Sequence, residues 1–254
     1  MLFLLRAYCY NRKGVIGFVR QGGSIRMSEE IWQVELHSHT LWSKDCVVNF
    51  ETIIRLCEQR GVDRIAITDH NTADGAIAMQ KLAPDLVIVG EEIMTDRGEI
   101  LGYFMQESIP AGLTPDETIR RLRDQKAVIS VSHPFDRLRK GAWYEEDLLK
   151  IIDQVDAIEV FNSRCMYAED NVKAQTFAEK HQLTGTVGSD AHSRVEYGRA
   201  LNRMQPFEGA ADFLLSLQAA QQVNRYSSWF VHLNSSTAKW SKKLGLRSRQ
   251  WKGG

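Results

Sequence analysis

From Gln33 onward, short runs rich in β-branched and aromatic residues alternate with longer stretches whose apolar positions recur at helical spacing. The runs predict strands over 33–36, 64–68, 86–90, 100–104, 127–132, 157–161 and 184–188, with a weaker strand over 199–204. The stretches between them predict helices over 50–60, 73–82, 114–125, 145–154, 168–181 and 207–220. Such alternation is typical of β/α units built around parallel strands.

Polar residues follow nearly every predicted strand at its carboxyl end. These residues are His37, Asp69, Glu92, His133, Asn162 and Asp190. An open sheet gathers its ligand-binding residues at one topological switch point, whereas a closed barrel draws them from many strands. The pattern therefore favours a β/α barrel with its site at the carboxyl ends of the strands.

Five of the seven histidines fall in four of these strand-end clusters. The clusters are His37-Ser38-His39, Asp69-His70, His133-Pro134 and Asp190-Ala191-His192, with the acidic pair Glu91-Glu92 between the second and third. Taken singly, each cluster is more typical of a capping pair, a turn or solvated charges. Their joint arrangement favours a metal site, and imidazole with carboxylate but no thiolate suits Zn, Mn or Fe(II).

Other reaction classes find less support in the sequence. Ser38, Ser132 and Ser189 flank histidines, but none lies in a G-x-S-x-G turn, and no G-x-G-x-x-G fingerprint is present. The four cysteines have no C-x-x-C spacing and are expected to be free thiols. No apolar run is long enough to span a bilayer, so we predict no transmembrane segment and a cytoplasmic location.

Charge is distributed unevenly along the 254 residues, although 32 basic and 32 acidic residues cancel overall. Five basic residues and no acidic one precede Met27, and seven basic and no acidic one follow Gln222, which leaves −12 between them. We therefore predict an N-terminal extension over 1–30, a catalytic barrel over 31–222 and a basic, aromatic tail over 223–254. The tail would dock on the barrel or remain solvated, bind nucleic acid, or bind an anionic membrane surface.

The ordered motifs between residues 33 and 204 resemble those of the PHP (polymerase and histidinol phosphatase) family. This resemblance implies a distorted (β/α)7 TIM-like barrel, of class α/β, that holds two to three divalent ions, a mixture of Mn, Fe and Zn. It implies that His37, His39, Glu92 and Asp190 bind one ion, that Glu92 and His133 share a second, and that Asp45, His70 and His192 hold a third. Glu99 and Asn162 are the candidates for one further ligand of the second ion.

The resemblance also implies hydrolysis of phosphate esters. The expected substrate is a phosphomonoester of a small metabolite or nucleotide, such as a 3′,5′-nucleoside bisphosphate, or a short oligonucleotide. Glu92 would offset the charge repulsion between the ions, Asp190 would orient the attacking hydroxide, and the fork of Arg164 would bind the substrate phosphate. A histidinol-phosphatase-type enzyme and a non-catalytic metal-binding or nucleic-acid-binding module are the alternatives.

Overall fold

The computed structural model describes residues 30–231. Its strands are β1 (Trp32–Glu35), β2 (Arg64–Ile67), β3 (Val87–Met94), β4 (Glu99–Tyr103), β5 (Val128–Val131), β6 (Ala157–Asn162), β7 (Thr184–Gly188), β8 (Ala200–Met204) and β9 (Gln221–Asn224). Its α-helices are α1 (Phe50–Arg60), α2 (Asp74–Leu82), α3 (Pro115–Asp124), α4 (Glu145–Leu148), α5 (Ala168–His181) and α6 (Ala210–Gln218). A short 3₁₀ helix, η1 (Ile152–Gln154), follows α4.

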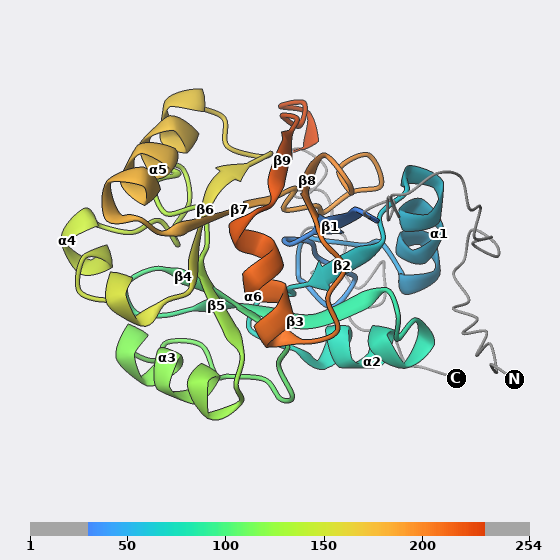
Figure 1. Ribbon diagram of the computed structural model, residues 1–254, viewed down its shortest axis with the longest axis horizontal. Helices are drawn as coiled ribbons and strands as arrows, with labels where there is room; N and C mark the ends of the chain where they lie inside the picture. The colour runs from blue at the N-terminus through green and yellow to red at the C-terminus, as the bar shows by residue number, and fades with distance from the viewer. Residues whose placement is uncertain (1–29, 232–254) are drawn as a thin grey trace, which may run out of the picture.

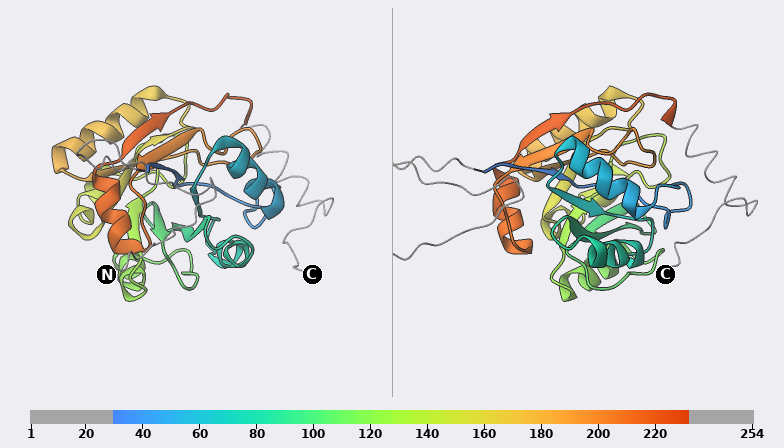
Figure 2. Two further views of the ribbon diagram at one scale, coloured as in Figure 1. Left: turned by 45° about the vertical axis from the view of Figure 1, so that its right-hand side comes forward. Right: turned by 90° about the vertical axis from the view of Figure 1, so that its right-hand side faces the viewer.

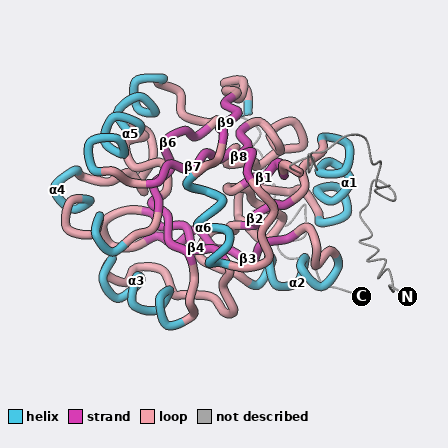
Figure 3. Tube along the Cα trace, in the orientation of Figure 1, coloured by secondary structure: helices cyan, strands magenta, loops and turns pink. Residues whose placement is uncertain are grey.

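The described strands form one curved sheet in the order β7-β6-β5-β4-β3-β2-β1-β8-β9. β1, β2 and β3 are parallel, and so are β5, β6 and β7. β4 runs antiparallel to both of its neighbours, and β8 runs antiparallel to β1. Figures 1 and 3 show the strands as a ring with α1 to α5 around its outside, which confirms the predicted distorted β/α barrel.

The buried side chain of Asn202 and an isolated parallel bridge between Ser38 and Ala191 join β7 to the strands at the other end of the sheet. Asn202 of β8 is fully buried, and its Oδ1 accepts a hydrogen bond from the backbone N–H of Val187 in β7 at 3.2 Å. Its Nδ2 donates to the carbonyl of Val187 at 2.8 Å and to that of Val34 in β1 at 3.3 Å. The amide therefore satisfies backbone groups of both strands, and the barrel is nearly closed.

Helix α6 covers one end of the barrel. Figure 1 looks at this end and shows α6 across the ring of strands, and Figure 2 shows the same helix at one side of the barrel. Phe213 and Leu217 of α6 pack into a buried cluster with strand residues such as Val34, Ile88 and Leu101. The amino-terminal end of the barrel is thus filled, and the carboxyl ends of the parallel strands are left to form a site.

Local sequence signals account for where the outer helices begin and end. The side chain of Asn49 accepts from the N–H of Thr52 at the start of α1, and Gly61 ends that helix in the left-handed conformation at φ 67°. Thr114 accepts from Glu117 at the start of α3, where Pro115 occupies the first turn. Both helices turn an apolar face toward the sheet and a charged face outward.

Several elements differ from the sequence prediction. β3 is longer than predicted and continues through Glu91 and Glu92 to Met94, because the antiparallel partner β4 pairs with its second half. The helix predicted over 145–154 is instead α4 followed by η1, and no helix separates β3 from β4.

The chain ends fall partly outside the described residues. Of the extension predicted over 1–30, residues 1–29 lie outside them, and so do residues 232–254 of the tail. β9 crosses the boundary predicted at residue 222, so the sheet continues into the segment assigned to the tail. Within the described part of the chain, no helix is both long and apolar enough to cross a membrane.

Candidate metal centre

Histidine and carboxylate side chains converge at the carboxyl ends of the parallel strands. His37 and His39 follow β1, His70 follows β2, His133 follows β5, and Asp190 and His192 follow β7. Glu92 differs, because it lies inside β3 and reaches the same end from the strand itself. All eight predicted ligands, including Asp45 from the loop after β1, are drawn into one cluster that is buried except at the edge of His70.

The carboxylate of Glu92 lies at the middle of the cluster, between four imidazole rings. Its Oε1 is 3.0 Å from Nε2 of His133 and 3.3 Å from Nε2 of His37. Its Oε2 is 2.8 Å from Nδ1 of His70 and 3.4 Å from Nε2 of His39. Each oxygen of Glu92 thus lies close to two ring nitrogens, so Glu92 would be a ligand to a cation held among these rings.

Asp45 and Asp190 complete the cluster on its other sides. Oδ1 of Asp45 is 3.3 Å from Nε2 of His192 and 3.5 Å from Nε2 of His70. Oδ1 of Asp190 is 3.2 Å from Nε2 of His39 and 3.7 Å from Nε2 of His37. Three groups of side chains offer ligand atoms within 4.8 Å of one another. They are His37, His39 and Glu92; His39, His70 and His192; and His70, Glu92 and Glu99.

The chemistry of these donors fits divalent cations. Buried atoms facing the centre of the cluster have no hydrogen-bond partner among residues 30–231: Nε2 of His37, His39 and His192, Oε2 of Glu92 and Oδ1 of Asp190. Buried polar atoms without partners are costly, and a cation between them would satisfy imidazole lone pairs and carboxylates together. The residues present therefore fit a metal centre.

Surrounding groups orient the rings toward the centre. Nδ1 of His37 is 3.0 Å from Oε1 of Glu159, and Nδ1 of His192 is 2.8 Å from the carbonyl of Asp190. Nδ1 of His39 is 3.0 Å from Oγ of Ser43. Because one ring nitrogen is held in each case, the Nε2 atom is the one presented inward, an arrangement typical of metal-binding histidines.

Electrostatics keep His39 and Glu92 in the form that a metal requires. Burial and the neighbouring rings of His192 and His70 hold the pKa of His39 well below its usual value, so this ring is neutral near pH 7. Burial alone would raise the pKa of Glu92, but His37 and His70 outweigh it and hold that pKa well below its usual value. A neutral imidazole and an ionised carboxylate are the ligating forms. Burial lowers the pKa of His37 and of His70, but Glu92 and the other carboxylates outweigh it and raise both pKa values well above the usual value, so a metal would displace a proton from these two rings.

The turn after β7 adopts an uncommon backbone conformation. Asp190 has a φ of 51°, a left-handed value that aspartate tolerates better than most residues. The preceding Gly188 has no room for a side chain, since a Cβ there would lie 2.4 Å from Cβ of His37 and from Oε1 of Glu159. This close approach brings β7 against the residues after β1 and directs Asp190 into the cluster.

Glu99, Asn162 and Arg164 occupy different positions around the cluster. Oε2 of Glu99 is 3.3 Å from Nε2 of His133, beside the predicted second ion. The amide of Asn162 is engaged by the protein, since Nδ2 donates to Glu159 at 3.1 Å and Oδ1 accepts from the N–H of Arg164 at 2.9 Å. Glu99 is therefore the better placed of the two additional candidates.

Arg164 contacts the backbone of Asp190, away from the carboxylate that faces the cluster. Its side chain is buried, with Nη1 3.5 Å from the carbonyl of Asp190 and Nε 3.4 Å from Oε1 of Glu196. Glu196 in turn accepts from the N–H of His192 at 3.1 Å. The guanidinium thus supports the β7 turn while also lining a pocket at the surface.

Two residues of the site escaped the sequence analysis. Glu159 on β6 holds His37 and accepts from the N–H of His133 at 2.8 Å, and a lone acidic residue in an otherwise apolar strand could have indicated it. Arg139 lies on the loop after His133. It contacts Oδ2 of Asp190, and its Nε is 3.5 Å from Oδ2 of Asp136. No sequence signal distinguishes Arg139 from Arg137, which pairs with Asp170 instead.

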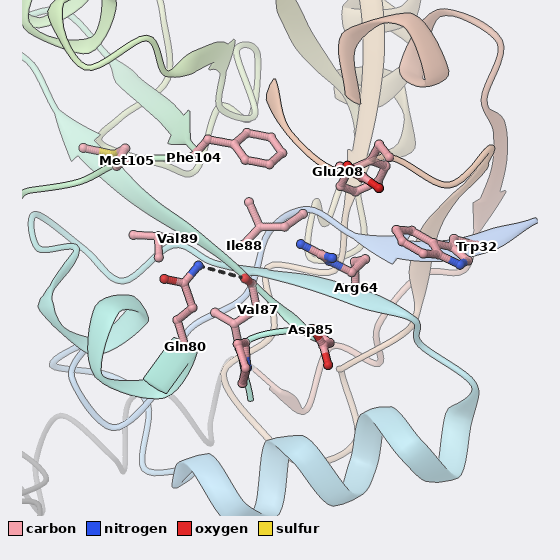
Figure 4. A pocket seen from close by; sticks show the side chains of 12 residues that line it. Trp32, Arg64, Gln80, Asp85, Val87, Ile88, Val89, Phe104, Met105 and Glu208 are labelled. Atoms are coloured by element: carbon pink, nitrogen blue, oxygen red, sulfur yellow. Dashed lines mark hydrogen bonds between the residues drawn. The ribbon is translucent and has the colours of Figure 1, made fainter. Parts of the chain in front are cut away.

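Two surface pockets differ in their relation to this cluster. A pocket of about 210 Å³ beside it is lined by Arg164, Cys165, Met166, Ala168, Tyr226, Ser227 and Trp229. A larger cavity of about 470 Å³ lies at the opposite end of the barrel, where β2 and β3 begin. Figure 4 shows Arg64 projecting into this cavity, and its guanidinium lies over the rings of Trp32 and Phe207.

Fold and site together define a nearly closed β/α barrel with a histidine- and carboxylate-rich cluster at the carboxyl ends of its strands. The PHP domain model matches residues 35–138, and the PHP-associated model matches residues 168–221. An uncharacterized protein of Methanocaldococcus jannaschii is 38% identical over 172 residues, which cover 66% of this chain and 68% of that protein. The chain belongs to the PHP family.

Two further comparisons are more distant. A phosphoribosyl 1,2-cyclic phosphate 1,2-diphosphodiesterase of Eggerthella lenta is 36% identical over 86 residues, which cover 30% of this chain and 32% of that protein. The crystal structure of a two-domain protein of Bacteroides vulgatus, with a predicted PHP-like metal-dependent phosphoesterase, superposes with a TM-score of 0.62. It is 18% identical and covers 82% of this chain and 70% of that one, which supports the shared fold.

Proposed function

We propose that this protein is a metal-dependent phosphoesterase that hydrolyses a phosphomonoester of a small metabolite or nucleotide. The observation that carries the proposal is the position of Glu92, whose two carboxylate oxygens each lie 2.8 to 3.4 Å from two imidazole nitrogens. We propose that the cluster holds divalent ions, because two ions close together lower the pKa of a bound water and polarise a phosphate ester.

The ligands would be shared as the family resemblance implies. His37, His39, Glu92 and Asp190 would hold one ion, with Glu92 shared toward His133 and Glu99. Asp45, His70 and His192 would hold another, which agrees with the short distances from Asp45 to both rings. We propose Mn, Fe or Zn, because the donors are imidazole and carboxylate without thiolate.

The residues around the ligands supply orientation and charge. Glu159 fixes His37 and, through the N–H of His133, also the start of the loop that carries Arg139. Asp190 would also orient the attacking water as a hydrogen-bond acceptor. The guanidinium of Arg139 is 22% exposed and lies at Asp190, so it would meet the phosphate oxygens of a substrate entering from solvent.

We propose that Arg164 also contributes to substrate binding, although its side chain is more buried than that of Arg139. Its side chain is 3% exposed and lines the adjacent pocket, so it would face the part of the substrate beyond the phosphate or support the turn of Asp190. Arg139 is the stronger candidate for the phosphate itself, because it is both nearer to solvent and in contact with a proposed ligand.

A phosphate-release panel tests the proposed function. Protein loaded with Mn, Fe or Zn would be assayed on a 3′,5′-nucleoside bisphosphate, histidinol phosphate and a short oligonucleotide. We expect phosphate release that requires metal and that falls at least about 100-fold in the His37→Ala variant. His181→Ala is the matched control, because His181 packs on Phe177 at the end of α5, away from the cluster. Absence of bound metal together with absence of metal-dependent hydrolysis would overturn the proposal.

A cyclic phosphodiester is the second candidate substrate class. It is favoured by the similarity to the Eggerthella lenta cyclic phosphate diphosphodiesterase, whose matched region is confined to 86 residues. Adding a ribose 1,2-cyclic phosphate to the panel distinguishes the two classes. If the cyclic ester is hydrolysed faster than every monoester, the substrate is a cyclic phosphodiester rather than a phosphomonoester.

A further inference from the structure

We propose that residues 225–231 complete the substrate pocket and that the indole of Trp229 stacks on a planar ring in the organic part of the substrate. This inference rests on the proposed phosphoesterase function and narrows its substrate class. The ligand would be a phosphate ester of a ring-bearing compound, such as a nucleotide, rather than of an open-chain or sugar alcohol. The pocket of about 210 Å³ between Arg164, Met166, Tyr226 and Trp229 is the place for that ring.

The segment after β9 is fixed against the barrel beside the metal cluster. The N–H of Ser227 donates to the carbonyl of Ser163 at 2.8 Å, directly after the end of β6. The ring of Tyr226 packs on Phe161 with ring centroids 4.9 Å apart, and its hydroxyl accepts from Nδ2 of Asn171 at 3.2 Å. Three contacts to β6 and α5 hold this segment at the carboxyl end of the barrel.

Further contacts hold the last described residues of the segment. Nη1 of Arg199 donates to the carbonyl of Tyr226 at 3.0 Å, and the side chain of Val231 is 2% exposed. The N–H of Val231 donates to the carbonyl of Ser228 at 3.0 Å, which turns the chain back on itself. A wall that is anchored on both sides of Trp229 is suited to binding a ligand in one orientation.

The aromatic side chains of this wall are exposed in spite of the anchoring. Trp229 is 59% exposed and Phe230 is 57% exposed, and their rings stack with centroids 3.9 Å apart at 27°. Met166 and Tyr167, on the loop that enters α5, are also exposed. A group of exposed apolar side chains beside a pocket is typical of a ligand-binding or partner-binding surface.

The pocket adjoins the proposed metal centre through Arg164 and Cys165. Arg164 belongs to its lining, and Nη1 of this side chain is 3.5 Å from the carbonyl of Asp190. Cys165 also lines it, with Sγ 3.5 Å from Oδ2 of Asp136, and Asp136 in turn contacts Arg139. Under the proposal, one ligand would reach around Arg164, with its phosphate at Arg139 and its organic part over Trp229.

The size of the pocket limits what it can hold. A volume of about 210 Å³ is below the roughly 300 Å³ or more that encloses a whole drug-sized ligand. It accommodates one ring system, with the remainder of the substrate in the metal cluster. Because aromatic stacking accepts any π-face, the pocket would select for the presence of a ring rather than for one particular base.

A matched pair of substrates tests the inference. Adenosine 5′-monophosphate and ribose 5-phosphate carry the same phosphate ester and differ in the base. With metal-loaded wild-type protein, we expect kcat/KM to be about 10-fold or more higher for adenosine 5′-monophosphate. Trp229→Ala should remove this preference through KM, and Trp229→Phe should retain most of it. Tyr144→Ala is the control, because Tyr144 is 79% exposed at the start of α4.

Calorimetric binding of adenosine 5′-monophosphate separates this inference from the proposed function. If wild-type protein hydrolyses neither substrate and no ester of the phosphate-release panel, yet binds this nucleotide at least about 10-fold more tightly than Trp229→Ala does, the pocket stands and the phosphoesterase assignment falls. If ribose 5-phosphate is hydrolysed equally well, or if Trp229→Ala affects both substrates alike while its melting temperature is unchanged, the inference about Trp229 is wrong. Absence of both hydrolysis and nucleotide binding overturns both.

Discussion

Glu91 and Glu92 are neighbours in the sequence, but their carboxylates lie on opposite faces of β3. Oε1 of Glu92 reaches His133 at 3.0 Å inside the barrel, whereas Oε2 of Glu91 accepts from the backbone N–H of Ile109 at 2.9 Å on the outside. Strand alternation separates them. Burial raises the pKa of Glu91 to about 8, so this buried side chain is protonated near neutral pH.

The first prediction uses this pair of neighbours. Glu92→Gln should lose at least one equivalent of bound metal and lower the hydrolysis rate at least about 100-fold, because it removes the central carboxylate. Glu91→Gln should keep metal and activity, since an amide resembles the protonated carboxyl group that it replaces. Elemental analysis and phosphate release measure both, and equal metal content in the two variants would contradict the assignment of Glu92.

The second prediction concerns the two arginines of one loop. Arg139→Ala should raise KM and lower kcat/KM by about 100-fold or more, because it removes a cation that would meet the phosphate. Arg137→Ala should have little effect, since Arg137 pairs with Asp170 and lies over the ring of Tyr167. Inhibition by inorganic phosphate gives an independent readout. It should weaken in Arg139→Ala alone, and unchanged inhibition would refute the proposed role.

The third prediction concerns removal of metal. Without cations, the carboxylates and unpartnered ring nitrogens of the cluster remain buried, which costs stability. Metal at about 100 times its dissociation constant contributes about 3 kcal/mol, so a chelator should lower the melting temperature by about 5 to 10 °C. Calorimetry with and without added Mn checks this shift. A melting temperature indifferent to chelation in the wild type, or an equal shift in His37→Ala, would count against a metal centre.

The fourth prediction concerns the thiols. Cys46, Cys57 and Cys165 are free and buried, and burial together with Glu35 raises the pKa of Cys57 to about 12. A raised thiol pKa adds stability that is fully present below about pH 8.5 and lost as the pH rises toward 12. With Cys9 replaced by serine, a disulfide reagent at pH 8 should label no thiol in native protein and three in denaturant. Rapid native labelling would show an accessible thiolate.

The fifth prediction concerns the helix that closes the barrel. Phe213 on α6 is fully buried against Tyr103 and Phe207, so Phe213→Ala should lower the free energy of unfolding by about 3 to 5 kcal/mol. Leu215→Ala, on the same helix with 69% of the side chain exposed, should change it by less than about 1 kcal/mol. Denaturant titration compares the two variants. Similar losses of unfolding free energy would mean that α6 does not pack against the end of the barrel through Phe213.

Much of the fold and of the candidate site is predictable from the sequence, because the signals involved are local. Helix α5 and strand β7 have the predicted bounds, since each is a continuous periodic segment with clear ends. The strand-end clusters indicate a shared edge, because parallel strands in a barrel present their carboxyl ends together. Free thiols are likewise predictable, and among the described cysteines they are confirmed.

The sequence by itself determined the β/α barrel class and the residue types of the candidate metal centre, whereas tertiary structure decided how the site is completed. The reversal of β4 brings Glu99 to the carboxyl end of the barrel, and Asn202 joins β7 to β8. Glu159 reaches His37 across 122 positions, and Arg139 reaches Asp190 across 51. Such contacts form because strands that are distant in the sequence pack around one barrel. No local pattern of hydrophobic and polar residues specifies which of their side chains meet.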